Sequence, residues 1–337
     1  MSTSFLVGAV ALASALAGLP AAATTTYRLV DLGPYSEALD INHKGQIAGG
    51  APEGGAGLYS HGEWRTKNIR RRSSIAIKID DAGNMVGQEW GAHDLVYMMY
   101  YPRGAKDYTI PMPDGANVGY LYSAAPVGVS PDGMQVVGVF QDVHDGRDHC
   151  FLWHPGDLVA TDIGLPGGGF SGCEAWDVND AGQVVGRVEA LNAGGAAFVW
   201  QNGTFTLVGP QGEKGGELTA VNKKGHAIGD VFASKGWYWD GKELHTIPPS
   251  GGLDMTYPTA INERDEIVGR GDGASGLTIL KYADGNLVDL VPLIEGAEQW
   301  KLADGLPTGI DEHGRISGYC YLVGGGAPHG YVLIPQD

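Results

Sequence analysis

One short pattern recurs seven times along this chain and sets the limits on its fold. In each copy an apolar stretch runs into Asn, Asp or Ser, and a second apolar stretch ends on Gly. The copies are ALDINHKGQIAG (38–49), AIKIDDAGNMVG (76–87), PVGVSPDGMQVVG (126–138), AWDVNDAGQVVG (175–186), LTAVNKKGHAIG (218–229), PTAINERDEIVG (258–269) and PTGIDEHGRISG (307–318). The closing glycines recur every 38 to 51 residues, which is the period of β-propeller blades.

The centre of each copy has the composition of a tight β-hairpin turn. Residues such as Asn42 and Asp80 can bond their own downstream backbone, and the glycine that follows in most copies adopts positive φ without strain. DDAG and SPDG also resemble fragments of calcium-binding loops. Lys223, Lys224 and Arg264 place cations where such ligands would be needed, so the turn interpretation is preferred.

A second hairpin follows six of the copies and gives each blade four strands. An aromatic residue stands before each of these second turns, at Tyr59, Tyr101, Trp153, Trp200, Trp239 and Tyr282. Rings at a fixed repeat position bury a large apolar area, so we expect them to pack between blades rather than to hold a ligand.

The two ends of the chain supply one blade between them. After the seventh copy, HGYVLIPQD (329–337) provides a third strand and then the sequence ends. TYRLVDLG (26–33) matches the fourth strands of other blades, so we expect it to complete the seventh. The sequence therefore predicts an all-β chain with a single domain over 24–337, a seven-bladed β-propeller of four-stranded blades.

Charge and the first residues indicate where the protein works. The net charge of −17 disfavours binding to nucleic acid or to an anionic membrane surface. Residues 1–23 form an apolar run that ends in Ala21, Ala22 and Ala23, which is typical of a signal peptide cleaved near Ala23. We expect a secreted or periplasmic protein that is not inserted in the membrane and is monomeric.

Three cysteines allow one internal bridge in an oxidising compartment. They are Cys150, Cys173 and Cys320, and we favour a disulfide between the first two. The alternative is that all three are small buried thiols, because free cysteine is often buried.

The repeats also resemble a known family. ALDINHKGQIAG, AWDVNDAGQVVG and the strand starts DHCFLW and PHGYVL are similar to the HAF-type extracellular repeats of bacterial exported proteins. The resemblance covers nearly all of the chain after residue 23 and implies export and a repeat fold. It implies no activity, so no catalytic residue follows from it.

The longer connections predict which face of the propeller carries a site. With the DIN-type strand innermost, the short turns meet on one face and the long irregular connections on the other, where binding residues concentrate. Aromatic rings beside carboxylates suit sugars or cationic peptides. The ligand-binding candidates on this face are Glu89, Trp90, His93, His144, Asp145, Asp148, Tyr257, Trp300 and Tyr319.

The segment from His144 to His149 is the densest polar cluster. We expect no metal or other cofactor, and we interpret the cluster as a solvated loop in which His149 has the structural part of the repeat. In the alternative, His144, Asp145 and Asp148 bind a divalent metal or provide an acid and a base.

The sequence is compatible with more than one class of function. The sequence has no nucleophile elbow, phosphate loop, HExxH or dinucleotide fingerprint. We therefore favour an exported binding or scaffold module that engages a glycan, peptide or protein through its long-loop face. A secreted lyase or hydrolase acting at the mouth of the central channel is the alternative, and a purely structural role in the envelope is a third.

Overall fold

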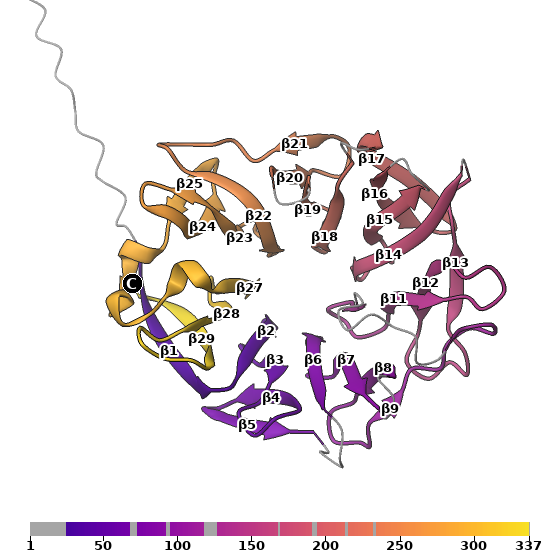
Figure 1. The fold of residues 1–337 in the computed structure, drawn as a ribbon, viewed down its shortest axis with the longest axis horizontal. Coiled ribbons are helices and arrows are strands. Elements are labelled where there is room, and N and C mark those ends of the chain that lie inside the picture. Colours follow the sequence, from indigo (N-terminus) through magenta and orange to yellow (C-terminus); the bar gives the residue numbers. More distant parts are fainter. Residues whose placement is uncertain are drawn as a thin grey trace, which may run out of the picture.

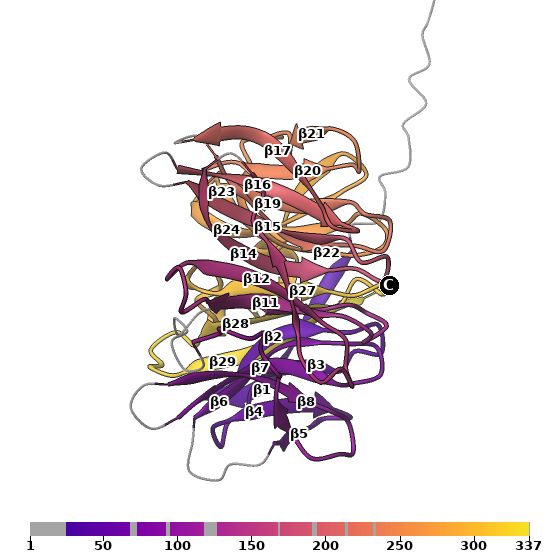
Figure 2. The ribbon, with the colours of Figure 1, turned by 90° about the vertical axis from the view of Figure 1, so that its right-hand side faces the viewer.

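A computed structural model gives the architecture of the chain. It describes residues 25–67, 73–91, 95–117, 127–167, 169–190, 194–212, 215–231 and 234–336. Seven antiparallel sheets stand around a central channel, as Figure 1 shows. The side view in Figure 2 shows their strands running from one face of the ring to the other. The predicted seven-bladed propeller is confirmed.

Six blades follow the chain in order, each from its innermost to its outermost strand. The first two blades are β2 (Glu37–Ile41), β3 (Ile47–Gly50), β4 (Ala56–Ser60) and β5 (Glu63–Thr66), and β6 (Ser74–Ile79), β7 (Met85–Trp90), β8 (Val96–Tyr101) and β9 (Tyr108–Thr109). The third and fourth are β10 (Val127–Val129), β11 (Val136–Gln141), β12 (Asp148–Trp153) and β13 (Thr161–Gly164), and β14 (Phe170–Val178), β15 (Val184–Ala190), β16 (Gly194–Gln201) and β17 (Thr204–Gly212). The fifth and sixth are β18 (Glu217–Val221), β19 (Ala227–Asp230), β20 (Gly236–Trp239) and β21 (Leu244–Thr246), and β22 (Asp254–Ile261), β23 (Ile267–Gly273), β24 (Gly276–Ala283) and β25 (Asn286–Asp289).

The seventh blade is closed by the other end of the chain, as predicted. Strands β27 (Leu306–Ile310), β28 (Ile316–Tyr321) and β29 (Pro328–Gln336) are completed by β1 (Thr26–Pro34), which runs antiparallel to β29. A short parallel strand, β26 (Ile294–Glu295), adds a fifth member that the repeat pattern does not predict. Because β1 lies between β26 and β29 in this sheet, neither of its edges is left unpaired.

A β-bulge interrupts six of the seven innermost strands at the same repeat position. In the first blade Ala38 pairs with Gly49 and Asp40 with Ala48, so Leu39 is the extra residue. The glycine that closes the repeat makes this possible. A Cβ at Gly49 would overlap the carbonyl oxygen of Glu37, and a Cβ at Gly229 would overlap that of Glu217 in the same way. The repeated glycine therefore gives the bulge its space.

Hydrogen bonds between neighbouring turns run around the whole ring. The Asn42 side chain accepts from the backbone N–H groups of Lys44 and Gln46, which holds its own turn, and its Nδ2 donates to the next blade. Each junction has such a bond: Asn42 Nδ2 to Asp80 O (2.9 Å), Asp81 N to Pro131 O (2.8 Å), Asp132 N to Asp180 Oδ1 (2.9 Å), Asn179 Nδ2 to Asn222 O (2.9 Å), Asn222 Nδ2 to Asn262 O (3.0 Å), Asn262 Nδ2 to Asp311 O (3.0 Å) and Arg315 Nη2 to His43 O (3.1 Å). The turn asparagine thus joins neighbouring blades at four of the seven junctions, and other residues of the turns do so at the remaining three.

The apolar core lies between the blades. One cluster joins Val86 and Tyr100 of the second blade to Phe151 and Trp153 of the third. The aromatic residues at the fixed repeat position all belong to such clusters, as predicted, with Tyr101 and Trp153 buried and Tyr59, Trp200, Trp239 and Tyr282 packed against buried residues. Burial of these rings stabilises the ring of blades.

Replacing Asn179 tests the bonds between turns. Asn179→Ala removes the bond to Asn222 O and leaves the backbone N–H groups of Ala181 and Gln183 without their acceptor. We expect the free energy of unfolding, measured by urea denaturation, to fall by about 1–3 kcal/mol. Asn286→Ala, at an exposed turn, is the control and should change it by less than about 0.5 kcal/mol. Equal effects of the two substitutions would contradict this role.

Candidate functional site

Two cavities occupy the central channel, one toward each face. The loop face is the one where the second-to-third and fourth-to-first connections of the blades emerge, and the turn face is the opposite one. The loop-face cavity has a volume of about 470 Å³ and the turn-face cavity one of about 430 Å³. Of the described residues, Lys78 alone lines both. The Lys78 side chain therefore marks the boundary between them.

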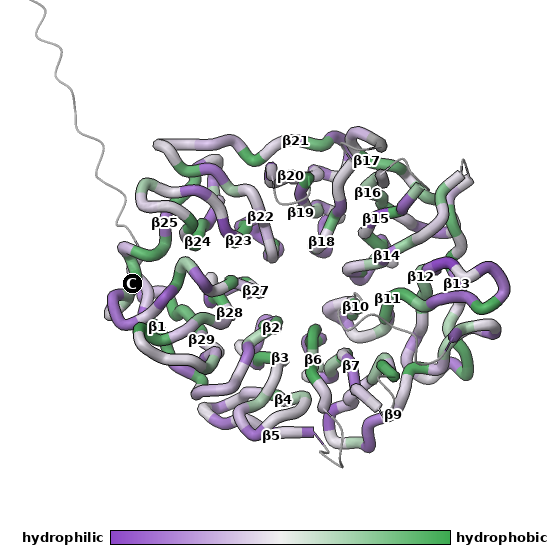
Figure 3. The backbone as a smooth tube through the Cα atoms, viewed as in Figure 1, coloured by the Kyte–Doolittle hydropathy of each residue, from purple (hydrophilic) through white to green (hydrophobic). Residues whose placement is uncertain are grey.

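The bulges determine which side chains face the loop-face cavity. A bulge re-aims the residues beside it, and the bulge position, or the equivalent position in the third blade, contributes a cavity-lining residue in every blade. These residues are Leu39, Ile77, Val127 and Trp176 in the first four blades and Thr219, Thr259 and Thr308 in the last three. One wall is consequently apolar, and Figure 3 shows β6 in the green of hydrophobic residues where it borders the channel.

The threonine wall offers fewer hydrogen-bonding groups than its composition indicates. Thr308 Oγ1 donates to the carbonyl of Ala38 at 2.7 Å, and Thr259 Oγ1 donates to that of Val268 at 3.2 Å. Thr219 Oγ1 lies 3.5 Å from the carbonyl of Ile228. Since these hydroxyl protons already have acceptors, a ligand in the cavity would meet mainly apolar surface.

The residue after each bulge position forms a charged floor beneath this wall. This position carries Asp40, Lys78 and Asp177 in the first, second and fourth blades, with Ala or Gly in the others. Burial opposes the charge of Lys78, but Asp177 and Asp40 raise its pKa above the ordinary lysine value. Burial raises the pKa of Asp40 to about 6 in spite of Lys78. The floor is a mutually compensating group of charges in which Asp177 is buried and Asp40 and Lys78 are half-buried.

The two aspartates of the floor are also tied to the next blade in the chain. Asp40 Oδ2 accepts a hydrogen bond from the backbone N–H of Ile79 at 3.0 Å. Asp177 Oδ2 accepts one from Val221 at the same distance. These bonds give the carboxylates a structural role at the junctions of the blades.

Glu217 stands at the rim of the loop-face cavity in a different environment. It is the first residue of β18 and pairs across the strands with the buried Asp230. Burial raises the pKa of Glu217 to about 7, and the nearby carboxylate of Asp230 adds to this shift while Arg187 opposes it. Within the described part of the chain, no hydrogen bond or ion pair reaches the Glu217 carboxylate. A carboxylate kept in such a place is a candidate functional group.

Two of the predicted residues meet at this cavity. Trp90, at the end of β7, and Tyr257, on β22, both line it. Trp176 and Glu217 complete the set of aromatic and acidic residues there, and the sequence analysis missed both of them. The signal that could have found them is their place in the repeat, because Glu217, Glu174 and Glu37 each stand five residues before the turn asparagine.

Other predicted residues lie away from the cavity lining. Glu89 is half-buried on β7, where it pairs with Ser74 and Tyr97. Tyr319 is half-buried on β28, near enough to Glu37 and Arg270 for both to affect its pKa. Trp300 packs edge-on against His329, with ring centroids 5.7 Å apart. His93 lies outside the described residues.

The polar cluster at 144–149 also lies apart from the cavity, on the connection between β11 and β12. His144 and Asp145 are exposed, and burial beside Glu189 raises the pKa of the half-buried Asp148. Among the described residues, the side chains close enough together to hold a metal ion are those of Asp142, His149 and Asp162. Their possible ligand atoms lie within 4.8 Å of one another. The set His144, Asp145 and Asp148 is thus not the one that the fold gathers.

The contact that His149 makes with an aspartate recurs in the seventh blade, which gives this histidine a structural role. His149 Nδ1 lies 2.8 Å from Asp162 Oδ2 of the fourth strand, and its Nε2 lies 3.3 Å from Asp145 Oδ2. At the equivalent place in the seventh blade, His329 Nδ1 lies 3.0 Å from Asp31 Oδ1. Burial opposes protonation of His149, but the two aspartates raise its pKa. The recurring histidine therefore ties the third strand of a blade to the fourth.

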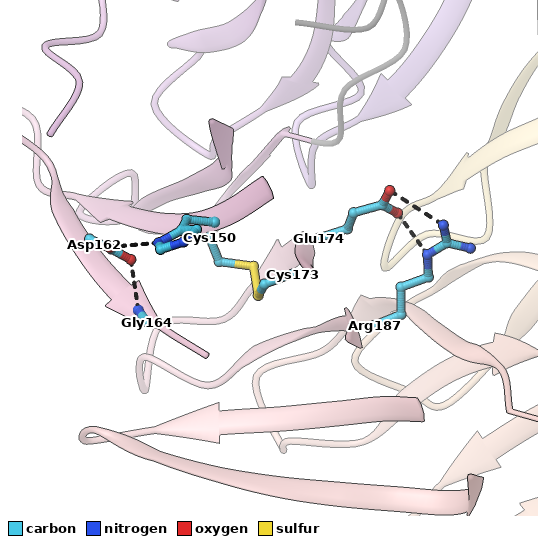
Figure 4. Close-up of a disulfide and its surroundings, with 7 residues drawn as sticks. Cys150, Asp162, Gly164, Cys173, Glu174 and Arg187 are labelled. Atoms are coloured by element: carbon cyan, nitrogen blue, oxygen red, sulfur yellow. Dashed lines mark hydrogen bonds and ion pairs between the residues drawn. A yellow bond between two sulfur atoms is a disulfide. The ribbon is translucent and has the colours of Figure 1, made fainter. Parts of the chain in front are cut away.

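A disulfide joins Cys150 to Cys173, the pair that the sequence analysis favours. It links β12 of the third blade to β14 of the fourth, with Cα atoms 5.4 Å apart (Figure 4). The next residues along the two strands are His149, bonded to Asp162, and Glu174, paired with Arg187 at 2.9 Å. The bridge fixes one blade junction near the loop face. Cys320 is free and buried, and burial raises the pKa of its thiol to about 12.

The turn face is crossed by ion pairs. Lys223, in the turn of the fifth blade, lies 3.4 Å from Asp81 Oδ2 of the second blade and 3.3 Å from Asp180 Oδ2 of the fourth. Its ammonium group thus spans the mouth of the turn-face cavity.

Comparisons with known proteins identify the fold only. No family model matches the chain, and no curated protein sequence does. An oligogalacturonate lyase from Vibrio parahaemolyticus is similar with a TM-score of 0.56 and 12% identity, over 91% of this chain and 93% of that one. A GH74 enzyme from Niastella koreensis gives a TM-score of 0.54 and 15% identity over 92% of this chain. A post-proline cleaving enzyme from Rickettsia typhi gives 0.54 and 8% over 90%.

The coverage of these neighbours differs. The chain spans 43% of the GH74 enzyme and 52% of the post-proline cleaving enzyme. All three have the names of enzymes, but identities of 8–15% show the fold alone, so both a ligand-binding and an enzymatic propeller are compatible with the comparison. As for the membrane, the described residues contain no helix with the length and apolar character needed to cross one.

The effect of Glu217→Gln on the free energy of unfolding should depend on pH. Because the folded-state pKa of about 7 exceeds the unfolded value, the folded protein binds an extra proton between pH 4.5 and 7 and loses stability as pH rises through this window. Removing the charge should therefore stabilise the protein at pH 8, by about 1–3 kcal/mol, and change little at pH 4.

Urea denaturation at the two pH values measures this effect. Glu266→Gln is the matched control with the opposite sign, because Glu266 pairs with Lys281 at 2.8 Å and this and other bonds lower its pKa. If Glu217→Gln were destabilising at pH 8, the carboxylate would have a stabilising partner and its assignment as a functional group would be wrong.

The disulfide has its own test. The double substitution Cys150→Ala and Cys173→Ala should lower the free energy of unfolding by about 2–4 kcal/mol. Under non-reducing conditions the wild-type protein should release one thiol, that of Cys320, and only after denaturation. Three titratable thiols in protein purified without reductant would show that the bridge does not form.

Proposed function

We propose that this chain is an exported binding module that engages a glycan, peptide or protein ligand through the loop-face cavity. The observation that carries the proposal is the grouping of Trp90, Trp176 and Tyr257 with Glu217 around a cavity of about 470 Å³. This volume lies in the range of roughly 300–1,000 Å³ that is usual for small-ligand sites. A few polar groups in a largely apolar cavity are also typical of such sites.

Export is part of the proposal. The disulfide between Cys150 and Cys173 supports it, because such bonds persist mainly in oxidising compartments. The net charge of −17 supports cationic or neutral partners rather than nucleic acid. Cleavage of the signal peptide near Ala23, membership of the HAF-repeat family and a monomeric state belong to the same proposal.

An enzyme acting at the same cavity is the second candidate. The observation that favours it is the pKa of Glu217, about 7, because a carboxyl that titrates near neutrality suits general acid–base chemistry. In this candidate the protein is a lyase or hydrolase whose acid–base group, Glu217, lies in the channel. Metal assistance through His144, Asp145 and Asp148 has no support from their position on the β11–β12 connection.

Array screening tests the binding proposal. Purified protein should retain a defined ligand on glycan or peptide arrays, and Tyr257→Ala should weaken that binding about tenfold or more, as loss of an aromatic anchor does. Tyr108→Ala, on the outermost strand β9, is the matched control and should bind like the wild type. Binding that Tyr257→Ala and Trp90→Ala leave unchanged would show that the cavity is not the site.

The same experiment separates the two candidates. Each ligand found on the arrays is incubated with the protein and examined by mass spectrometry for cleavage. Turnover that Glu217→Gln abolishes would support the enzyme, and stable binding without turnover would support the module.

A further inference from the structure

The loop-face cavity has an ordered charge profile from its rim to its floor. Glu217 stands at the rim, the bulge residues form the wall, and Lys78 lies at the floor, near enough to Asp177 and Asp40 for both to raise its pKa. The Lys78 position is three residues further along its strand than the Glu217 position, or about 10 Å at the rise of a β-strand. An acidic group, then apolar side chains, and then the mixed charges of Lys78, Asp40 and Asp177 thus follow one another from the rim to the floor.

This profile distinguishes between ligand chemistries. A neutral sugar needs several partners that donate as well as accept hydrogen bonds, but Thr308 and Thr259 can only accept, because their hydroxyl protons already bond to backbone carbonyls. A lysine or arginine side chain would carry its positive charge down to the floor, where Lys78 stands. A ligand with its positive charge at the rim and an apolar group below it avoids both difficulties.

The rim has further acidic character. Asp230 lies directly across the strands from Glu217, and Glu174 occupies the equivalent rim position in the preceding blade. Arg187 pairs with Glu174 at 2.9 Å and also with Glu189, so its charge is already shared between two carboxylates. The group that remains to be neutralised at the cavity is Glu217.

We propose, on the basis of the proposed binding function, that the cavity takes the amino-terminal residue of a peptide. The α-ammonium group donates to the Glu217 carboxylate at the rim. The apolar side chain of that residue lies against Leu39, Ile77 and Trp176, and the rest of the peptide leaves across the loop face. A volume of about 470 Å³ suits one such residue with part of the next.

The test uses peptides that differ by single groups. The probe is Phe-Gly-Gly amide. Its matched controls are N-acetyl-Phe-Gly-Gly amide and 3-phenylpropanoyl-Gly-Gly amide, which lack the ammonium group, and Gly-Gly-Gly amide, which lacks the side chain. Binding is measured by calorimetry at pH 7.5 with the full-length mature protein, and the fluorescence of Trp90 and Trp176 gives a second readout.

We expect the wild-type protein to bind Phe-Gly-Gly amide about ten- to hundredfold more tightly than either peptide without the ammonium group. Glu217→Gln should remove this preference while leaving the weak binding of the acetylated peptide unchanged. Glu63→Gln, on the outermost strand β5, is the control and should keep the preference. Thermal melts of each variant verify that it is folded.

Three results would overturn the inference. One is equal binding of the free and acetylated peptides, and another is a preference that survives Glu217→Gln. The third is tight binding of an array glycan that Tyr257→Ala abolishes, with no binding of any peptide probe. In that third case the proposed binding function stands and only the ligand class is wrong, whereas a failure of the binding function itself would leave every array ligand insensitive to Tyr257→Ala.

Discussion

The channel depends on one local constraint, a bulge in the innermost strand that faces a glycine in the neighbouring strand. At Gly49 and Gly229 any side chain would overlap a carbonyl oxygen of the bulged strand. Where the glycine is present, two successive residues of the inner strand are turned toward the channel instead of one. The bulge residue builds the wall and the residue after it builds the floor, so the repeat that stabilises the fold also produces the lining of the site.

Charges in the channel divide into two kinds according to how they are compensated. Asp177 and Asp40 raise the pKa of Lys78, and both aspartates accept backbone hydrogen bonds from the next blade. Such a group is costly to break and is sufficiently explained by structure. Glu217 is different, since its closest charged neighbour in β19 is another carboxylate, Asp230. A half-buried carboxylate beside a buried one favours protonation or a bound cation, and the proposed ligand provides that cation.

The repeat made the fold predictable, because turn residues and strand alternation act locally. Seven blades, the closing strand β1 and the packing of the aromatic residues all followed from spacing. The fifth strand β26 did not, since it forms from a short segment outside the repeat. The disulfide pair could be favoured because the two cysteines lie on neighbouring loop-face segments, but its geometry depends on the junction between two blades.

The site was less accessible to sequence reasoning. His144, Asp145 and Asp148 stood out because they are close in sequence, yet the fold uses His149 to tie strands together and leaves the cluster away from the cavity. Glu217, Trp176 and Lys78 are far apart in the chain and meet only because each occupies a bulge-related position in its own blade. Counting back from the turn residue of each copy puts Glu217 five, Trp176 three and Lys78 two residues before it, on successive levels of the channel.

Closure of the ring by β1 also affects how two copies of this protein can pair with each other. The bonds that seal the ring, such as that between Tyr35 N and Pro328 O at 2.8 Å, join segments nearly 300 residues apart and are not covalent. An identical strand from a second copy presents the same groups in the same register. Partial opening at high concentration therefore favours exchange of β1 between two rings, which yields a strand-swapped pair in which each propeller is complete.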